Sequence, residues 1–292
     1  MTPPGSGTAD DADPSGVTRV ELPVDTRAPG GTTNAYLVNG LLVDPAARTE
    51  RLDAAVTAHG GSTRPAEPDA AEASSSPGDA RIEAIAVTHA HPDHVGAVAD
   101  YAHQTGATVY APADGADRIR DAIGIPPDAT VRDGDTIGTT GVRVLATPGH
   151  APEHVAFGVG LDDETVAAEA LVGDLAVAEG SVVVGAPDGD LSAYLDSLER
   201  VRDAGFDRLY PGHGPRIDEP SAACQRLIDH RLARETAVAE AVAAGASDVD
   251  AVLEAAYEKD LAGVEDLARA TVRAHLEKLA AEGRIDDAWR VE

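Results

Sequence analysis

Short apolar runs alternate with amphipathic segments along the first two thirds of the chain. The apolar runs predict strands at 34–38, 40–43, 82–87, 107–110, 142–147, 154–159, 170–173 and 207–210. Between them, apolar residues at helical spacing predict helices at 48–58, 94–104, 113–122 and 190–204. Asn39 and Gly40 separate the first two runs and are typical of a tight hairpin turn. The alternation of strands and helices predicts an α/β protein.

The pattern changes after residue 218. Strand signals nearly vanish, and helical periodicity predicts helices at 219–244, 248–257 and 264–282. The closing IDDAWRVE predicts a short strand or wing. We therefore expect a main domain at 17–218 and a small, mostly helical domain at 219–292.

Two segments have the composition of disordered chain. Residues 1–16 are rich in Gly, Pro, Ser and Asp, and 60–80 have low sequence complexity. Such segments bury too little apolar surface to offset the conformational entropy of ordering. We expect a disordered N-terminus at 1–16 and a surface insertion at 60–80.

Composition narrows the class of protein. The chain has 292 residues, 43% of them hydrophobic, and a single cysteine, Cys224, which excludes a disulfide framework and a Cys-rich zinc module. No apolar run approaches the length of a membrane span, and the acidic N-terminus lacks the apolar core of a signal peptide. We therefore expect a protein of the cytoplasm with no membrane partner.

The net charge of −28 is extreme, and only two of the 23 basic residues are lysines. Acidic residues spread over the whole chain favour a protein adapted to high salt, where self-repulsion is screened. An acidic surface that binds a partner is the alternative. At ordinary salt this charge would repel nucleic acid.

The stretch THAHPDHVG at 88–96 carries the most distinctive chemistry. Because 82–87 is predicted to be extended, His89 and His91 point to the same side and can meet at one metal ion. Pro92 begins a turn that lets Asp93 and His94 reach a second position, and Asp93 is also suited to cap a helix that starts at His94. Three imidazoles and a carboxylate exceed what one open catalytic site needs, so the spacing suits two metals.

Three later strand ends present further ligand types. TPGH ends at His150, LVGD ends at Asp174, and LYPGHG contains His213. Ligands of α/β folds gather at such strand ends. The alternative, a set of unrelated loop histidines, does not explain why four turns share this arrangement. His154 is expected to pack against the site loop without being a ligand, and His275 is expected to be a core histidine.

These motifs resemble the metallo-β-lactamase-fold superfamily of metal-dependent hydrolases. The resemblance implies an αββα sandwich in which His89, His91 and His150 hold one metal and Asp93, His94 and His213 hold a second. It implies that Asp174 bridges the metals, that Asp93 is also catalytic, and that Asp44 supports the site from behind the ligands. Zinc suits such mixed imidazole and carboxylate ligands, with iron or manganese as alternatives. The implied reaction is hydrolysis by a metal-bridging hydroxide that attacks a carbonyl or a phosphorus.

The C-terminal segments HRLARE (230–235) and VRAHLEKLAAEGR (272–284) resemble the β-lactamase-like protein 2 family, which has a winged-helix-like tail. That resemblance implies a single-stranded RNA endoribonuclease as one alternative. An aspartate at 174 also resembles glyoxalase II, which implies a small ester or thioester substrate; a non-catalytic metal- or RNA-binding module is the third alternative. Residues 247–292 hold six bases and twelve acids, so the tail is a poor RNA surface. It could instead support a homodimer or cover the mouth of the active site.

Overall fold

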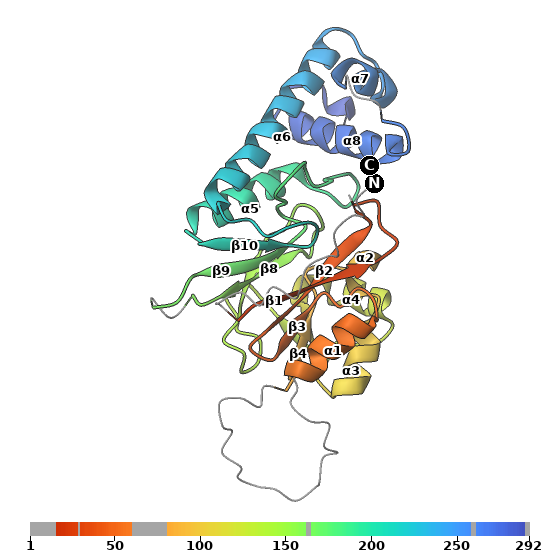
Figure 1. Ribbon diagram of the computed structural model, residues 1–292. Coiled ribbons are helices and arrows are strands. Elements are labelled where there is room, and N and C mark those ends of the chain that lie inside the picture. Colours follow the sequence, from red (N-terminus) through yellow and green to blue (C-terminus); the bar gives the residue numbers. More distant parts are fainter. Residues whose placement is uncertain (1–15, 29, 60–80, 162–164, 258–260, 290–292) are drawn as a thin grey trace, which may run out of the picture.

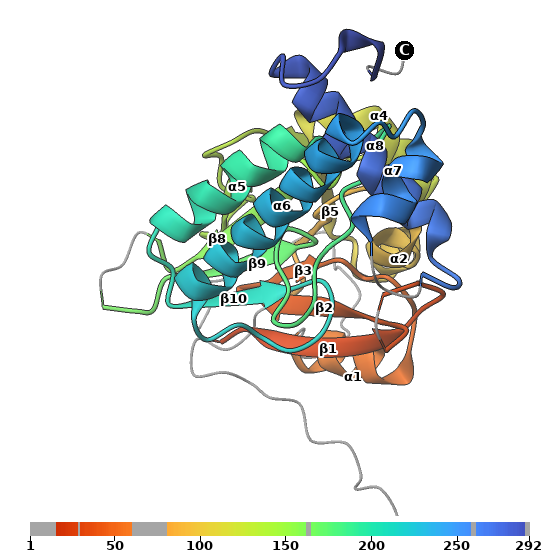
Figure 2. The ribbon, with the colours of Figure 1, turned by 90° about the horizontal axis from the view of Figure 1, so that it is seen from above.

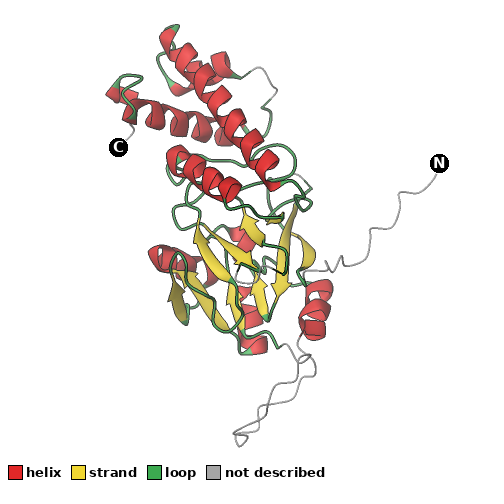
Figure 3. Ribbon diagram, turned by 90° about the vertical axis from the view of Figure 1, so that its left-hand side faces the viewer, coloured by secondary structure: helices red, strands yellow, loops and turns green. Residues whose placement is uncertain are grey.

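Two β-sheets packed face to face, with helices on their outer surfaces, form the main part of the molecule (Figures 1 and 3). The computed structural model describes residues 16–28, 30–59, 81–161, 165–257 and 261–289. The segments predicted to be disordered, 1–16 and 60–80, therefore lie outside the described residues, apart from Gly16.

The first sheet has six strands in the order β1-β2-β3-β4-β5-β6. These are β1 (Thr18–Pro23), β2 (Thr32–Val38), β3 (Leu41–Val43), β4 (Ala84–Ala86), β5 (Thr108–Pro112) and β6 (Ala129–Val131). β1, β2 and β3 pair antiparallel, and β3 to β6 pair parallel. The hairpin predicted at Asn39 and Gly40 is confirmed, with φ of 50° and 79° at the two residues, as a type I′ turn requires.

The second sheet has four strands in the order β10-β9-β8-β7. These are β7 (Arg143–Ala146), β8 (Val155–Val159), β9 (Glu169–Gly173) and β10 (Arg208–Pro211). β10 pairs parallel with β9, and the other neighbours pair antiparallel.

Helices on the outer faces complete the main domain. Against the first sheet lie α1 (Glu50–His59), α2 (Pro92–Val95), α3 (Val98–Thr105), the 3-10 turn η1 (Ala113–Gly115) and α4 (Ala116–Ile123); against the second lies α5 (Leu191–Asp203). The helix predicted at 94–104 is two helices, because Ala97 leaves helical geometry (φ −115°, ψ 11°). The predicted cap at Asp93 is wrong. The helix begins earlier, at Pro92, whose missing N–H costs nothing in the first turn, and His91 takes the N-cap position.

Side-chain alternation separates three apolar layers. In β4, Ile85 packs towards the helices while Ala84 and Ala86 face the second sheet. In β9, Leu171 faces the first sheet while its neighbours pack against α5 and the first half of α6 (Pro220–Ala243). This arrangement confirms the predicted αββα sandwich.

Three helices form the C-terminal region (Figure 2). The second half of α6 packs with α7 (Val249–Ala256) and α8 (Glu265–Ala281) around a separate apolar cluster. Asp287–Trp289 form a 3-10 turn, η2, in place of the predicted strand, so that prediction is wrong for these residues. The described residues after 219 contain no strand that could serve as a wing. His275 is fully buried, as expected. No helix in the described part of the chain is both long and apolar enough to cross a membrane.

Candidate metal centre

The structure brings all seven predicted ligands to one place, beyond the ends of strands from both sheets. They follow β4, β7, β9 and β10, the four strand ends at which the sequence placed them. Three overlapping groups have donor atoms within 4.8 Å of one another: His89, His91 and His150; His89, His94 and Asp174; and Asp93, His94 and His213.

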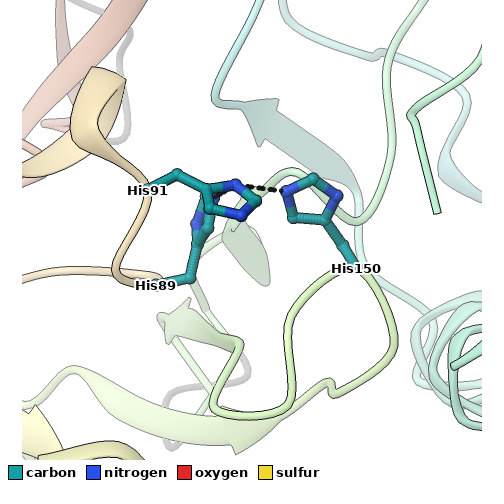
Figure 4. A group of neighbouring side chains, drawn as sticks. All are labelled: His89, His91 and His150. Atoms are coloured by element: carbon teal, nitrogen blue, oxygen red, sulfur yellow. Dashed lines mark hydrogen bonds between the residues drawn. The ribbon is translucent and has the colours of Figure 1, made fainter. Parts of the chain in front are cut away.

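Three imidazoles form the first group (Figure 4). His91 Nδ1 lies 2.9 Å from His89 Nε2 and 2.9 Å from His150 Nε2. The rings meet edge to face, so three nitrogens converge on one point from different directions. Such convergence of imidazole nitrogens suits one divalent metal with a position left open.

Asp93, His94 and His213 form the second group, and the Asp174 carboxylate lies near histidines of both groups. Asp174 Oδ1 is 3.5 Å from His94 Nε2 and 3.4 Å from His213 Nε2. Its other oxygen is 3.5 Å from His150 Nε2, in the first group. Asp93 Oδ2 is 3.7 Å from His213 Nε2. Asp174 is therefore placed between the two groups, with one oxygen towards each.

Two orphaned polar atoms test whether the residues fit a metal. His94 Nε2 and Asp174 Oδ1 are buried and have no hydrogen-bond partner among the described residues. Leaving a buried polar atom unpaired costs about 1–3 kcal/mol, so native proteins rarely do it without a ligand. A divalent cation between them would satisfy both atoms. The set of donor atoms therefore fits a divalent metal.

Asp44 orients His94 directly and His89 through Thr88. It follows β3 and accepts hydrogen bonds from Thr88 N at 2.7 Å and Thr88 Oγ1 at 2.8 Å. Its Oδ2 also lies 2.9 Å from His94 Nδ1, and Thr88 Oγ1 lies 2.9 Å from His89 Nδ1. Because Nδ1 of both rings donates to these oxygens, Nε2 faces the site and is the nitrogen available to a metal.

Backbone carbonyls do the same for two of the three remaining rings, His150 and His213. His150 Nδ1 donates to Val183 O at 2.6 Å, and His213 Nδ1 donates to Thr32 O at 2.8 Å. The tautomer with a free Nε2 is therefore fixed in both.

Three further contacts were not predicted. Thr26 Oγ1 donates to Asp93 Oδ2 at 2.5 Å, and Glu153 accepts from Ala90 N at 3.0 Å, between two of the histidines. His154 Nε2 accepts from Asp174 N at 3.2 Å, so His154 supports a neighbouring residue. Only His154 had a sequence signal, its place four residues after His150.

The pKa shifts in the site favour positive charge beside Asp174, carried by a protonated His94 or by a bound cation. Burial, reinforced by the other imidazoles, lowers the pKa of His89 well below its ordinary value. Burial also acts to lower the pKa of His94, but the carboxylates of Asp174 and Asp44 outweigh it and raise that pKa to about 9. Burial acts to raise the pKa of Asp174, yet the surrounding histidines, His94 first, hold it below its usual range. Asp174 therefore stays ionised, with a cation expected beside it.

Gly212 permits the close approach of the two ligand-bearing loops. A Cβ on this residue would lie 2.6 Å from Asp174 Oδ1 and 2.7 Å from His94 Cε1. Both distances are shorter than real Cβ contacts, so only glycine leaves room for the ligands here.

An αββα sandwich with two adjoining His/Asp groups at its strand ends defines a class of metal-dependent hydrolases. The family profile described as metallo-beta-lactamase superfamily matches residues 28–213. The chain belongs to this superfamily.

Individual relatives agree with the assignment. Beta-lactamase-like protein 2 homologs from Caenorhabditis elegans and Drosophila melanogaster are 33% and 31% identical over 159 and 219 residues, 54% and 70% of this chain. A hydroxyacylglutathione hydrolase from Bradyrhizobium sp. is 39% identical over 132 residues, 44% of this chain. The chain spans about half the length of the worm and bacterial proteins (50% and 47%) and 71% of the fly protein.

A solved structure extends the likeness to the C-terminal helices. A metallo-beta-lactamase family protein from Thermus thermophilus has 25% sequence identity and a TM-score of 0.67. The match covers 92% of this chain and 94% of that one. The helical C-terminal region is thus part of the architecture that the two proteins share.

Proposed function

We propose that the chain is a dinuclear metal-dependent hydrolase that cleaves a small ester or thioester. The position of Asp174 carries the proposal, because its two oxygens lie at 3.4–3.5 Å from histidines of both ligand groups. One carboxylate shared in this way suits two ions held side by side.

In this proposal His89, His91 and His150 hold one ion, Asp93, His94 and His213 hold the other, and Asp174 lies between them. Zinc is the proposed metal because imidazole and carboxylate ligands suit it, with iron and manganese as alternatives. Such ions would supply Lewis acidity, which activates water near neutral pH and stabilises negative charge on the substrate.

The protein's own part is to hold these donors rigidly. Asp44, through Thr88, fixes the rings of His89 and His94. The Thr26 hydroxyl donates to Asp93 Oδ2, which restricts the orientation of that carboxylate. We assign Asp93 the catalytic role of orienting the attacking water, since it is the most exposed of the carboxylates in the ligand set.

The substrate class rests on charge and on relatives. A net charge of −28 disfavours polyanions at ordinary salt. Relatives named hydroxyacylglutathione hydrolase and atrochrysone carboxyl ACP thioesterase act, by those names, on thioesters. Single-stranded RNA is the competing substrate, proposed from the resemblance to the β-lactamase-like protein 2 family.

One panel tests both substrates. Zinc-loaded protein is assayed at low and high salt with an acyl-thiol and with labelled single-stranded RNA, beside Asp93→Ala. We expect thioester cleavage that Asp93→Ala lowers by at least 100-fold, a loss of about 2.7 kcal/mol in transition-state stabilisation. RNA cleavage sensitive to the same substitution would replace the thioester proposal. Bound metal with neither activity in a broader hydrolase panel would support a non-catalytic module.

A further inference from the structure

Two arginines of the HRLARE segment in α6 make matching contacts at different places. Arg234 donates to Ala256 O, and its guanidinium lies 3.7 Å from the ring centroid of Tyr257. Both partners belong to the C-terminal helical region. Arg231 likewise combines a carbonyl with an aromatic ring, but its partners belong to the main domain.

Arg231 is buried and holds two parts of the main domain together. Only 3% of the residue is exposed, and its guanidinium donates to Val182 O. The same group lies 5.7 Å from the ring centroid of Tyr194 in α5. Burying a cation is costly unless it is paired, so these contacts stabilise one placement of the side chain.

The hydrogen bond from Arg231 to Val182 O connects Arg231 with His150. Val183, the residue after the carbonyl that Arg231 binds, accepts the hydrogen bond from His150 Nδ1 at 2.6 Å. A shift of the 182–183 backbone would therefore turn the ring and move Nε2 away from the other imidazoles.

The contact of Arg231 with the Tyr194 ring connects Arg231 with Asp174 and, by a second route, with His150. Tyr194 donates its hydroxyl hydrogen to Leu175 O at 2.7 Å, directly after Asp174. The backbone of Tyr194 also packs so closely on Gly149, the residue before His150, that a Cβ there would collide with it. Tyr194 thus supports both ligand loops, and Arg231 lies against its ring.

From these contacts, we infer that Arg231 is a positioning residue of the metal centre, through which the C-terminal helices hold His150 and Asp174 in place. The inference rests on the proposed function, since it concerns metal held by those residues. Loss of a supporting residue behind the ligands commonly weakens metal affinity by about 10–100-fold. We expect a loss in that range when Arg231 is removed.

The test compares Arg231→Met with Arg234→Met, which removes an equivalent pair of contacts from the same helix. Zinc affinity is measured by competition with a chromophoric chelator, and the visible spectrum of the cobalt-loaded protein reports ligand geometry. We expect Arg231→Met to bind zinc at least tenfold more weakly, with an altered cobalt spectrum, while Arg234→Met matches wild type in both. If Arg231→Met does not fold, Arg231→Lys and Arg234→Lys make the same comparison.

The outcomes separate this inference from the proposed function. Wild-type protein that binds no metal would overturn both. Wild-type protein that binds two ions, with Arg231→Met unchanged or Arg234→Met equally weakened, would overturn the inference alone.

Discussion

Asp44 Oδ2 lies 2.9 Å from His94 Nδ1, and Asp44 reaches this position with its backbone in the left-handed region (φ 49°). A residue other than glycine held in this region costs of order 1–3 kcal/mol unless its surroundings compensate. Here Thr88 compensates, because its N–H and its hydroxyl both donate to the Asp44 carboxylate. The strained backbone is therefore tied directly to the orientation of a candidate ligand.

Asp44→Asn should weaken metal binding by about 10–100-fold with a smaller effect on folding. The amide replaces one acceptor oxygen by a donor, so it cannot accept from both Thr88 and His94 as the carboxylate does. Chelator competition on wild type and variant measures the effect. Asp128→Asn, in an exposed carboxylate that accepts from Val109 N, is the control. Equal affinity of Asp44→Asn and wild type would contradict the role assigned to Asp44.

Gly212→Ala should remove metal binding almost completely. The new methyl group would lie 2.6 Å from Asp174 Oδ1 and would force apart the loops that carry Asp174 and His94. Gly214→Ala is a matched control, because a Cβ there meets nothing within 4 Å and only its positive φ is strained. Metal content after zinc loading should be near wild type in the control and near zero in Gly212→Ala. Full metal content in Gly212→Ala would show that the loops adjust.

The seven clustered donors could be predicted because a short strand followed by a His or Asp leaves a readable pattern in the sequence. The contacts that orient them could not. Val183 and Thr32 act through backbone carbonyls, which any residue carries, so no side-chain pattern marks them. Thr26 meets Asp93 across 67 positions of sequence, and an isolated threonine gives no sign of such a contact.

The fold, too, could be predicted only in part. The hairpin and the alternating strands were predicted, but β1 and β6 were not, because a strand of six residues with mixed polarity and one of three residues carry weak periodicity. Pairing with β2 and β5 supplies the stabilisation that these segments lack locally. The strand or wing predicted for the closing IDDAWRVE is wrong for Asp287–Trp289, which form a 3-10 turn.

His275 should make the C-terminal region sensitive to acid. It is fully buried and neither ring nitrogen has a hydrogen-bond partner in the described structure. Burial lowers its pKa to about 3, and cationic neighbours add to this effect; they are Arg231, Arg234, Lys278 and His230. The unfolded chain, with an ordinary histidine pKa of about 6.5, binds more protons below that pH, so stability is lost as pH falls from about 6.5 towards 3.

His275→Met should remove this part of the pH dependence. Above pH 7 the variant should be at least as stable as wild type, since an apolar side chain replaces an unpaired polar one. Below pH 6.5 the free energy of unfolding of wild type should fall relative to the variant by up to about 1.4 kcal/mol per pH unit. Urea unfolding of both metal-free proteins between pH 5 and 8 measures the difference. Parallel curves would mean that His275 has the same pKa in the folded and unfolded chain, which would contradict the prediction.

Salt should stabilise the protein, although its surface carries many ion pairs. Exposed pairs such as Arg27–Asp266 are worth about 0–1 kcal/mol each and weaken as salt is added. The excess of 51 acidic over 23 basic residues acts in the opposite direction, because each unpaired carboxylate repels the others.

Raising potassium chloride from about 0.1 M to about 1 M shortens the screening length from about 10 Å to about 3 Å, so this repulsion should be largely removed. We expect the unfolding midpoint to rise over this range by more than it does in sucrose of equal osmolality, which strengthens burial without screening charge. A midpoint that falls with potassium chloride would show that the ion pairs outweigh the repulsion and would contradict an adaptation to high salt.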